Sequence, residues 1–120
     1  MAQRPAAIFA LFAGLLGFAV AGFAPQIFHD GDSWWHLAAG AWMLDHRHAL
    51  KIDVFSFTMA GRPWDAQEWF SEILMALSFR LAGWNGLHLL FGAATGATAA
   101  IVTYYVRART AALPALLISV

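Results

Sequence analysis

Cysteine is absent from the 120-residue chain, which excludes disulfide bonds, thiolate metal sites and a cysteine nucleophile. Charged residues are scarce at 12%, about half the usual quarter of a soluble domain, whereas 61% of the residues are hydrophobic, against roughly 45–50%. The formal charges balance and no basic run is present, which argues against a nucleic-acid partner. This composition predicts a membrane protein.

A long apolar run near the N-terminus predicts a first membrane span. Residues 6–24 contain no charged or strongly polar side chain, and at about 1.5 Å per residue the run approaches the roughly 30 Å of the hydrocarbon core. Arg4 precedes the run and the acids follow it, so the positive-inside rule predicts a cytoplasmic N-terminus. Ala19 and Ala21 also fit the cleavage site of a signal peptide. The run is longer than the roughly 7–15 apolar residues of such a peptide, and more spans follow, which favours a retained anchor.

Residues 25–86 form the predicted outer segment. All seven acidic residues lie between Asp30 and Glu72, and all six tryptophans lie between Trp34 and Trp84. Tryptophan rings prefer the headgroup level of a membrane. We therefore expect this segment to lie at the membrane surface.

Two surface helices are predicted in the outer segment. In residues 33–46 an apolar face at helical spacing accompanies a narrow polar stripe. The apolar face comprises Trp34, Leu37, Ala38, Ala41 and Leu44, and the stripe comprises Ser33, His36, Gly40 and Arg47. Residues 65–82 place Asp65, Glu68 and Glu72 on one helical face, and the glycines at 83 and 86 end this helix. Residues 51–64 fit either a strand pair or an irregular loop.

A second span, residues 87–106, returns the chain across the membrane. It carries no formal charge and ends at two tyrosines followed by Arg107 and Arg109, which is typical of a cytoplasmic end. Gly92 and Gly96 have the spacing that allows another helix to approach closely. A third span begins at residue 111 and is cut short at residue 120, so we expect an N-terminal fragment of a longer chain. The predicted fold is an all-α, polytopic membrane protein with two full transmembrane helices, the start of a third and two interfacial helices.

Residues 29–36 carry the densest group of reactive side chains, at the outer end of the first span. Asp30 and Asp32 are separated by one glycine and precede His36. An Asp-x-Asp pair suits Mg²⁺ or Mn²⁺ bound with phosphate, so a divalent cation on Asp30 and Asp32 is one interpretation. Asp32 directly before a helix is also an ordinary N-cap. Arg62 is a candidate for a lipid phosphate, although contact with lipid headgroups explains it equally well.

Four motifs resemble the N-terminal part of the GT-C superfamily of membrane glycosyltransferases. They are Asp30-Gly-Asp32-Ser-Trp34-Trp35-His36-Leu37-Ala-Ala-Gly40, Asp53-Val-Phe55-Ser56-Phe57-Thr58, Gly61-Arg62-Pro63-Trp64 and Gln67-Glu68-Trp69. The resemblance is to the protein-mannosyltransferase-like and aminoarabinose-transferase-like branch. Members of this branch have an outward first span, an outer loop with two membrane-parallel helices and an acidic motif, and a return span.

The resemblance implies a bacterial inner-membrane enzyme that transfers a sugar from a polyprenyl-phosphate donor to an acceptor at the outer, periplasmic face. Its partners are then membrane lipid and the lipid-linked sugar. Asp32, or else Asp30, matches the acidic residue that acts as base or positions the acceptor. Related motifs place two acids side by side, whereas Gly31 separates them here, so the choice between the two stays open. Glu68 resembles the family's acid before tryptophan and is a candidate substrate-binding residue, or else a first-turn acid that the helix dipole favours. His36 lies one turn from Asp32 and is a candidate to orient that carboxylate or contact a phosphate, or else it anchors the helix to its neighbour.

The alternative is a non-catalytic polytopic protein, either part of a transporter or an assembly subunit. A transporter more often places ionisable groups within its spans. Here His88 is the one ionisable residue within the two predicted spans, which favours the transferase.

Overall fold

The computed structural model describes residues 3–28 and 31–110, which form three helices and no strand. These are α1 (Gln3–Gly22), α2 (Gly31–His46) and α3 (Trp69–Thr110). The all-α fold is therefore confirmed over this range. The predicted start of a third span at residue 111 lies outside the described residues.

The chain divides into two compact units. The first unit contains α1 and the part of α3 from His88 onward. The second unit runs from Gln26 to Leu87 and contains α2 with the first part of α3.

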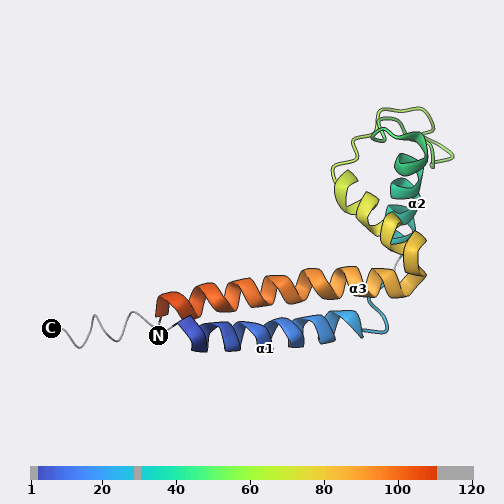
Figure 1. Ribbon diagram of the computed structural model, residues 1–120. Helices are drawn as coiled ribbons and strands as arrows, with labels where there is room; N and C mark the ends of the chain where they lie inside the picture. Colours follow the sequence, from blue (N-terminus) through green and yellow to red (C-terminus); the bar gives the residue numbers. More distant parts are fainter. Residues whose placement is uncertain (1–2, 29–30, 111–120) are drawn as a thin grey trace. The chain divides into compact units, whose positions relative to one another are not determined.

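In the first unit, α1 and the C-terminal part of α3 lie side by side and antiparallel (Figure 1). Small residues make the contact: a Cβ added to Gly14 would lie 3.1 Å from Ala100 Cβ, and one added to Gly96 would lie 2.7 Å from the Gly14 carbonyl oxygen. The Arg107 guanidinium lies 3.8 Å from the centre of the Phe9 ring, near the start of α1. The predicted close approach at Gly96 is confirmed.

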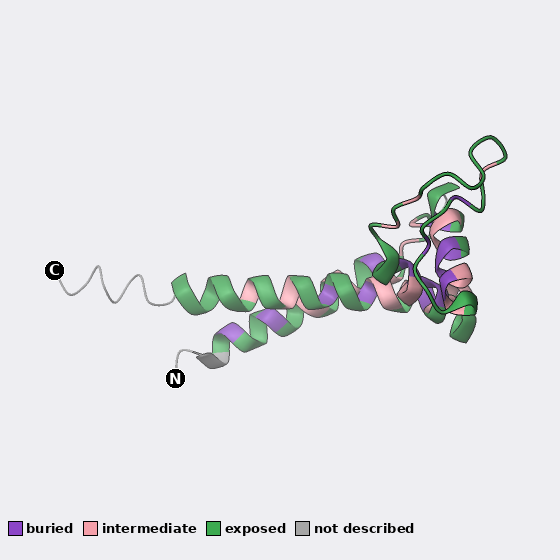
Figure 2. Cartoon of the chain, turned by 90° about the horizontal axis from the view of Figure 1, so that it is seen from above, coloured by how far each residue is buried: buried purple, intermediate pink, exposed green. Residues whose placement is uncertain are grey.

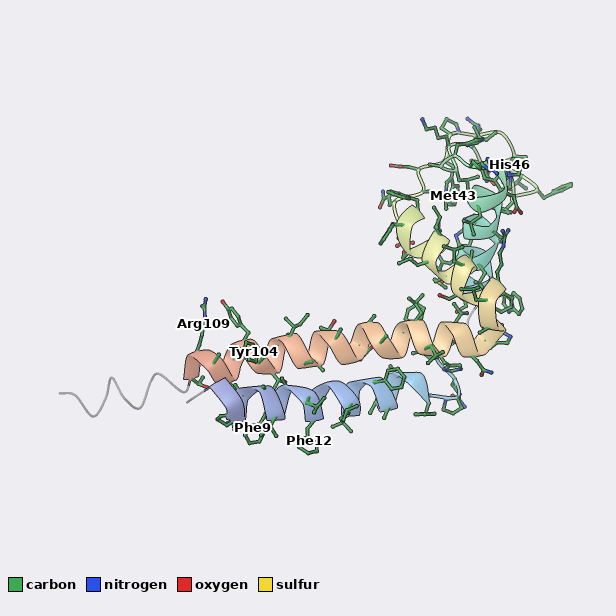
Figure 3. The ribbon with its side chains drawn as sticks, viewed as in Figure 1. Phe9, Phe12, Met43, His46, Tyr104 and Arg109 are labelled. Carbon is green, nitrogen blue, oxygen red and sulfur yellow. The ribbon has the colours of Figure 1, made fainter. Side chains whose placement is uncertain are left out.

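The outer surface of this helix pair is apolar. Phe12 points away from α3 in Figure 3, and Figure 2 shows mainly exposed residues along both helices. The exposed side chains include Ile8, Leu11, Phe12, Leu16, Val20, Leu89, Ile101 and Val102. Both α1 and α3 are long and apolar enough to cross a membrane, and only 17% and 11% of their most apolar windows are buried. The core helix of a soluble protein is mostly buried, whereas these two helices are mostly exposed.

Several predicted helix limits differ from the structure. The second surface helix begins at Trp69 rather than at residue 65 and continues, as α3, through the predicted return span. Two non-helical residues interrupt α3, Ala82 (φ −145°) and Gly83 (φ 56°), so the break predicted at Gly83 is present. The predicted inner turn after residue 106 is helical up to Thr110.

In the second unit, α2 packs against the first part of α3. Ala39, Met43 and Leu50 form the buried core, and it is covered by partly buried neighbours, namely Trp42, Trp64, Ala66 and Ile73. Buried residues accordingly follow one another along α2 in Figure 2.

The buried face of α2 overlaps only in part with the predicted apolar face. Leu37 of that face is buried and Ala41 and Leu44 are half-buried, but Trp34 and Ala38 are exposed, while Ser33 and Gly40 of the predicted polar stripe are buried. The reason is steric. A Cβ on Gly40 would overlap the Glu72 carbonyl oxygen of α3, so only glycine allows the two helices to cross this closely.

Residues 51–64 form an irregular loop, and the strand-pair alternative is not formed. Its pairing is limited to one isolated bridge between Ile52 and Pro63. The N–H of Asp53 donates to the Arg62 carbonyl at 2.8 Å, and the N–H of Gly61 donates back to the Asp53 carbonyl at 2.8 Å. Gly61 has φ 79°, a conformation that glycine adopts without steric cost.

Candidate functional site

A histidine from α2 meets two carboxylates, one in the first turn of α3 and one in the turn that precedes it. His36 Nδ1 lies 3.1 Å from Glu72 Oε1 and 3.7 Å from Glu68 Oε2. The three donor atoms all lie within 4.8 Å of one another. With its proton on Nδ1, His36 donates a hydrogen bond to Glu72. We refer to these three residues as the His36–Glu68–Glu72 cluster.

The crossing at Gly40 explains why this cluster forms. His36 precedes Gly40 by four residues, so both lie on the same side of α2. Gly40 brings α2 against the backbone of Glu72, which places the imidazole beside the Glu72 carboxylate. The first turn of a helix also favours a carboxylate, because the helix dipole is positive there.

Glu72 is the buried member of the cluster. Its side chain is 5% exposed, compared with 29% for His36 and 66% for Glu68. Oε1 contacts His36, but Oε2 is buried and has no hydrogen-bond partner among the residues that the structure describes. Burying a carboxylate oxygen without a partner is costly, so a cation or a hydrogen-bond donor bound at this oxygen would stabilise the structure.

Asp32 is exposed and lies inside the first turn of α2, because the helix begins at Gly31. It is therefore not the residue directly before the helix that an N-cap interpretation requires. Asp32 precedes His36 by four residues, so the two share a helical face. Asp30 lies outside the described residues, and both its catalytic role and the Asp30–Asp32 cation site remain predictions.

Arg62 is exposed in the loop and is not part of the cluster. The acid nearest to it in this loop is Asp53, which is buried at 4% exposure. Asp53 Oδ1 accepts hydrogen bonds from the N–H groups of Phe55 at 3.0 Å and Ser56 at 2.8 Å. Hydrogen bonds from the Ser56 side chain, and then from its backbone, lower the pKa of Asp53 below its usual value. Asp53 thus stays ionised and shapes the loop.

An open cavity of about 420 Å³ lies at the C-terminal end of α2. Most of its lining is apolar, but a cationic side chain and an imidazole also line it. The lining residues are Met43, Leu44, Arg47, His48, Ala49, Trp69 and Ile73. Such a cavity suits an apolar chain that carries an anionic group.

No protein-family model, curated protein or solved structure matches the chain.

The sequence alone pointed to His36 and Glu68, and the structure brings them together. The sequence did not single out Glu72 as a site residue. A signal was present: Glu72 stands four residues after Glu68 and is followed by the apolar run Ile73–Leu77. A carboxylate inside an apolar helical run, with no basic residue four positions away, indicates a hydrogen-bond or ion-pair partner on another element.

The site contains the exposed carboxylate of Asp32, the imidazole of His36 and the carboxylates of Glu68 and Glu72. The exposed acid is accessible to a substrate, and an imidazole between two carboxylates is held in one orientation. Proton transfer and cation binding are the reactions that these groups support.

Proposed function

We propose that the chain is the N-terminal membrane module of a glycosyltransferase, which transfers a sugar from a polyprenyl-phosphate donor to an acceptor at the outer face of a bacterial inner membrane. The observation that carries the proposal is the exposed Asp32, one helical turn from His36, which in turn contacts Glu68 and Glu72. Three of these four residues belong to the motifs that resemble the GT-C superfamily.

The proposed topology has α1 and the C-terminal part of α3 as two transmembrane helices, with the N-terminus in the cytoplasm. Their apolar, exposed surfaces support this, as does the position of Arg107 beside Phe9 at the start of α1, because arginine is typical of cytoplasmic ends. In this topology α2 and the first part of α3 belong to the outer segment, at the membrane interface.

In the proposed reaction, Asp32 accepts the proton of the acceptor hydroxyl as that oxygen attacks the sugar carbon. The bond between sugar and phosphate then breaks, and the polyprenyl phosphate leaves. A base must be reachable by its substrate, and the exposure of Asp32 meets this condition. His36, one helical turn after Asp32, and Glu68, which contacts His36, are the proposed substrate-binding groups.

The cavity at the end of α2 supports binding of the donor lipid. Leu44, Trp69 and Ile73 offer apolar surface to a polyprenyl chain, while Arg47 and His48 offer positive charge or hydrogen bonds to its phosphate. Arg62 lies in the neighbouring loop and is a second candidate for the phosphate.

The decisive experiment compares Asp32→Asn with the unchanged protein in isolated membranes. The substrates are synthetic polyprenyl-phosphate mannose and polyprenyl-phosphate aminoarabinose, and the measurement is release of polyprenyl phosphate. Loss of a positioned base lowers the rate by roughly 10²–10⁴-fold, so we expect Asp32→Asn to lose transfer while membrane insertion is unchanged.

Asp65→Asn is the matched control, because Asp65 is an exposed acid outside the cluster. It should transfer sugar at the unchanged rate. If Asp32→Asn also transfers at that rate, Asp32 is not the base. If neither donor is consumed by the unchanged protein, the non-catalytic alternative is favoured.

A further inference from the structure

The His36–Glu68–Glu72 cluster has the dimensions of a metal site. In a tetrahedral site with metal–ligand distances of about 2.1 Å, neighbouring donor atoms lie about 3.4 Å apart. His36 Nδ1 lies 3.1 Å from one carboxylate oxygen and 3.7 Å from the other, which brackets this value. Glu68 is the most exposed of the three, so its side chain is free to bring its carboxylate closer to that of Glu72.

Burial supplies a second, independent observation. The Glu72 carboxylate is almost fully removed from solvent, and its Oε2 has no partner among the described residues. His36 satisfies only the other oxygen. A cation bound at the cluster would neutralise both carboxylates and compensate for the missing partner.

We propose that His36, Glu68 and Glu72 bind one divalent transition-metal ion, with Zn²⁺ as the best fit. An imidazole ligand favours zinc and similar metals over Mg²⁺ and Ca²⁺, which prefer an all-oxygen set. Three protein ligands leave a fourth position open, as in catalytic zinc sites, and the exposure of Glu68 leaves that position accessible. The ion binds whether or not the chain transfers sugar.

This site differs from the cation site that the sequence indicated. The sequence pointed to Mg²⁺ or Mn²⁺ on Asp30 and Asp32, whereas the group assembled by the structure draws on α2, α3 and the turn before α3. Asp32 is not one of the three proposed ligands.

The test is a titration of the full chain in detergent micelles after treatment with a chelator. Zn²⁺ binding is measured by calorimetry, and Co²⁺ is used as a spectroscopic probe because a tetrahedral site gives it a visible absorption band. We expect one saturable Zn²⁺ site, the Co²⁺ band, and no displacement by Mg²⁺ at equal concentration. Zn²⁺ should also raise the denaturation midpoint, because it binds only the folded chain.

Glu72→Gln removes one ligand with little change in shape, and it should weaken Zn²⁺ binding by at least about tenfold, the lower limit seen even for residues that only support a ligand. Asp65→Asn, the exposed control, should bind like the unchanged protein. Tryptophan fluorescence checks that each variant is folded. Absence of saturable Zn²⁺ and Co²⁺ binding in the unchanged protein, or equal binding by folded Glu72→Gln, would overturn the proposal and leave an ion pair only.

Discussion

Replacement of Gly40 by alanine should destabilise the second unit, although alanine is the better helix former. The added methyl group would overlap the Glu72 carbonyl oxygen and would lie 3.0 Å from Ala76 Cβ. A backbone carbonyl cannot rotate away as a side chain does, so α2 and α3 must separate. Separation by a fraction of an ångström already forfeits much of the contact energy between packed surfaces.

The expected magnitude follows from two opposing terms. Overpacking typically costs about 1–3 kcal/mol, and a collision with backbone belongs at the upper end, while alanine gains about 1 kcal/mol over glycine in helix propensity. We expect a net loss of about 2 kcal/mol in the free energy of unfolding of the second unit. For a domain of this size, that loss corresponds to about 8–16 °C in Tm.

Intrinsic tryptophan fluorescence is the appropriate measurement, because all six tryptophans lie between Trp34 and Trp84, inside the second unit. Gly31→Ala is the matched control: it lies in the same helix, and a Cβ there would meet nothing within 4 Å. It should leave Tm unchanged or raise it slightly. Equal melting of Gly40→Ala and Gly31→Ala would refute the steric argument, as would full recovery of Gly40→Ala by Ala76→Gly, which leaves the carbonyl in place.

Two further predictions concern the loop and the helix pair. Asp53→Ala removes the acceptor for the N–H groups of Phe55 and Ser56, so it should lower the denaturation midpoint at pH 7, and Asp53→Asn should lower it less. The folded pKa of Asp53 lies below the ordinary 3.8, so its ionised form stabilises the fold above pH 3.8. This contribution should disappear as the pH falls through the lowered pKa. Denaturation midpoints of the unchanged protein and of Asp53→Asn that fall in parallel between pH 5 and pH 2 would contradict this. Gly96→Val should separate α1 from α3 at a cost of about 1–3 kcal/mol and speed amide hydrogen exchange in residues 11–22. Ala94→Val, at an exposed position, should leave this exchange unchanged. Equal exchange in the two variants would show that the contact at Gly96 does not limit the opening of α1.

The sequence was sufficient to predict the two apolar helices and the break between the surface helix and the return span. Long apolar runs and glycines are local signals, and Gly83 interrupts α3 as expected. The close contact at Gly96 was also predicted, because small residues at helical spacing indicate a neighbouring helix.

The buried face of α2 was predictable from hydrophobicity only in part. Leu37 of the apolar face is buried, but Trp34 of the same face is 58% exposed, and its ring makes edge contacts with Phe79 and Trp84. The actual crossing point is set by the absence of a side chain at Gly40. Close approach depends on shape, which a hydrophobicity pattern does not record.

The candidate site was predicted in part. His36 and Glu68 were chosen from the sequence, whereas Glu72 was found only through its burial beside His36. The pairing between residues 36 positions apart depends on how the two helices cross. No spacing within either helix contains that information.

The contacts between α1 and α3 are made by glycine backbones, alanine methyl groups and the side chain of Phe18. In a bilayer, separation of two such helices exposes their facing surfaces to lipid tails and not to water. The heat capacity of the pair should then change little on separation, and its free energy should vary almost linearly with temperature. The second unit, which buries Met43 and Leu50, should instead show the curved temperature dependence that comes from hydration of apolar groups. Cooling would therefore weaken the second unit before it weakens the helix pair.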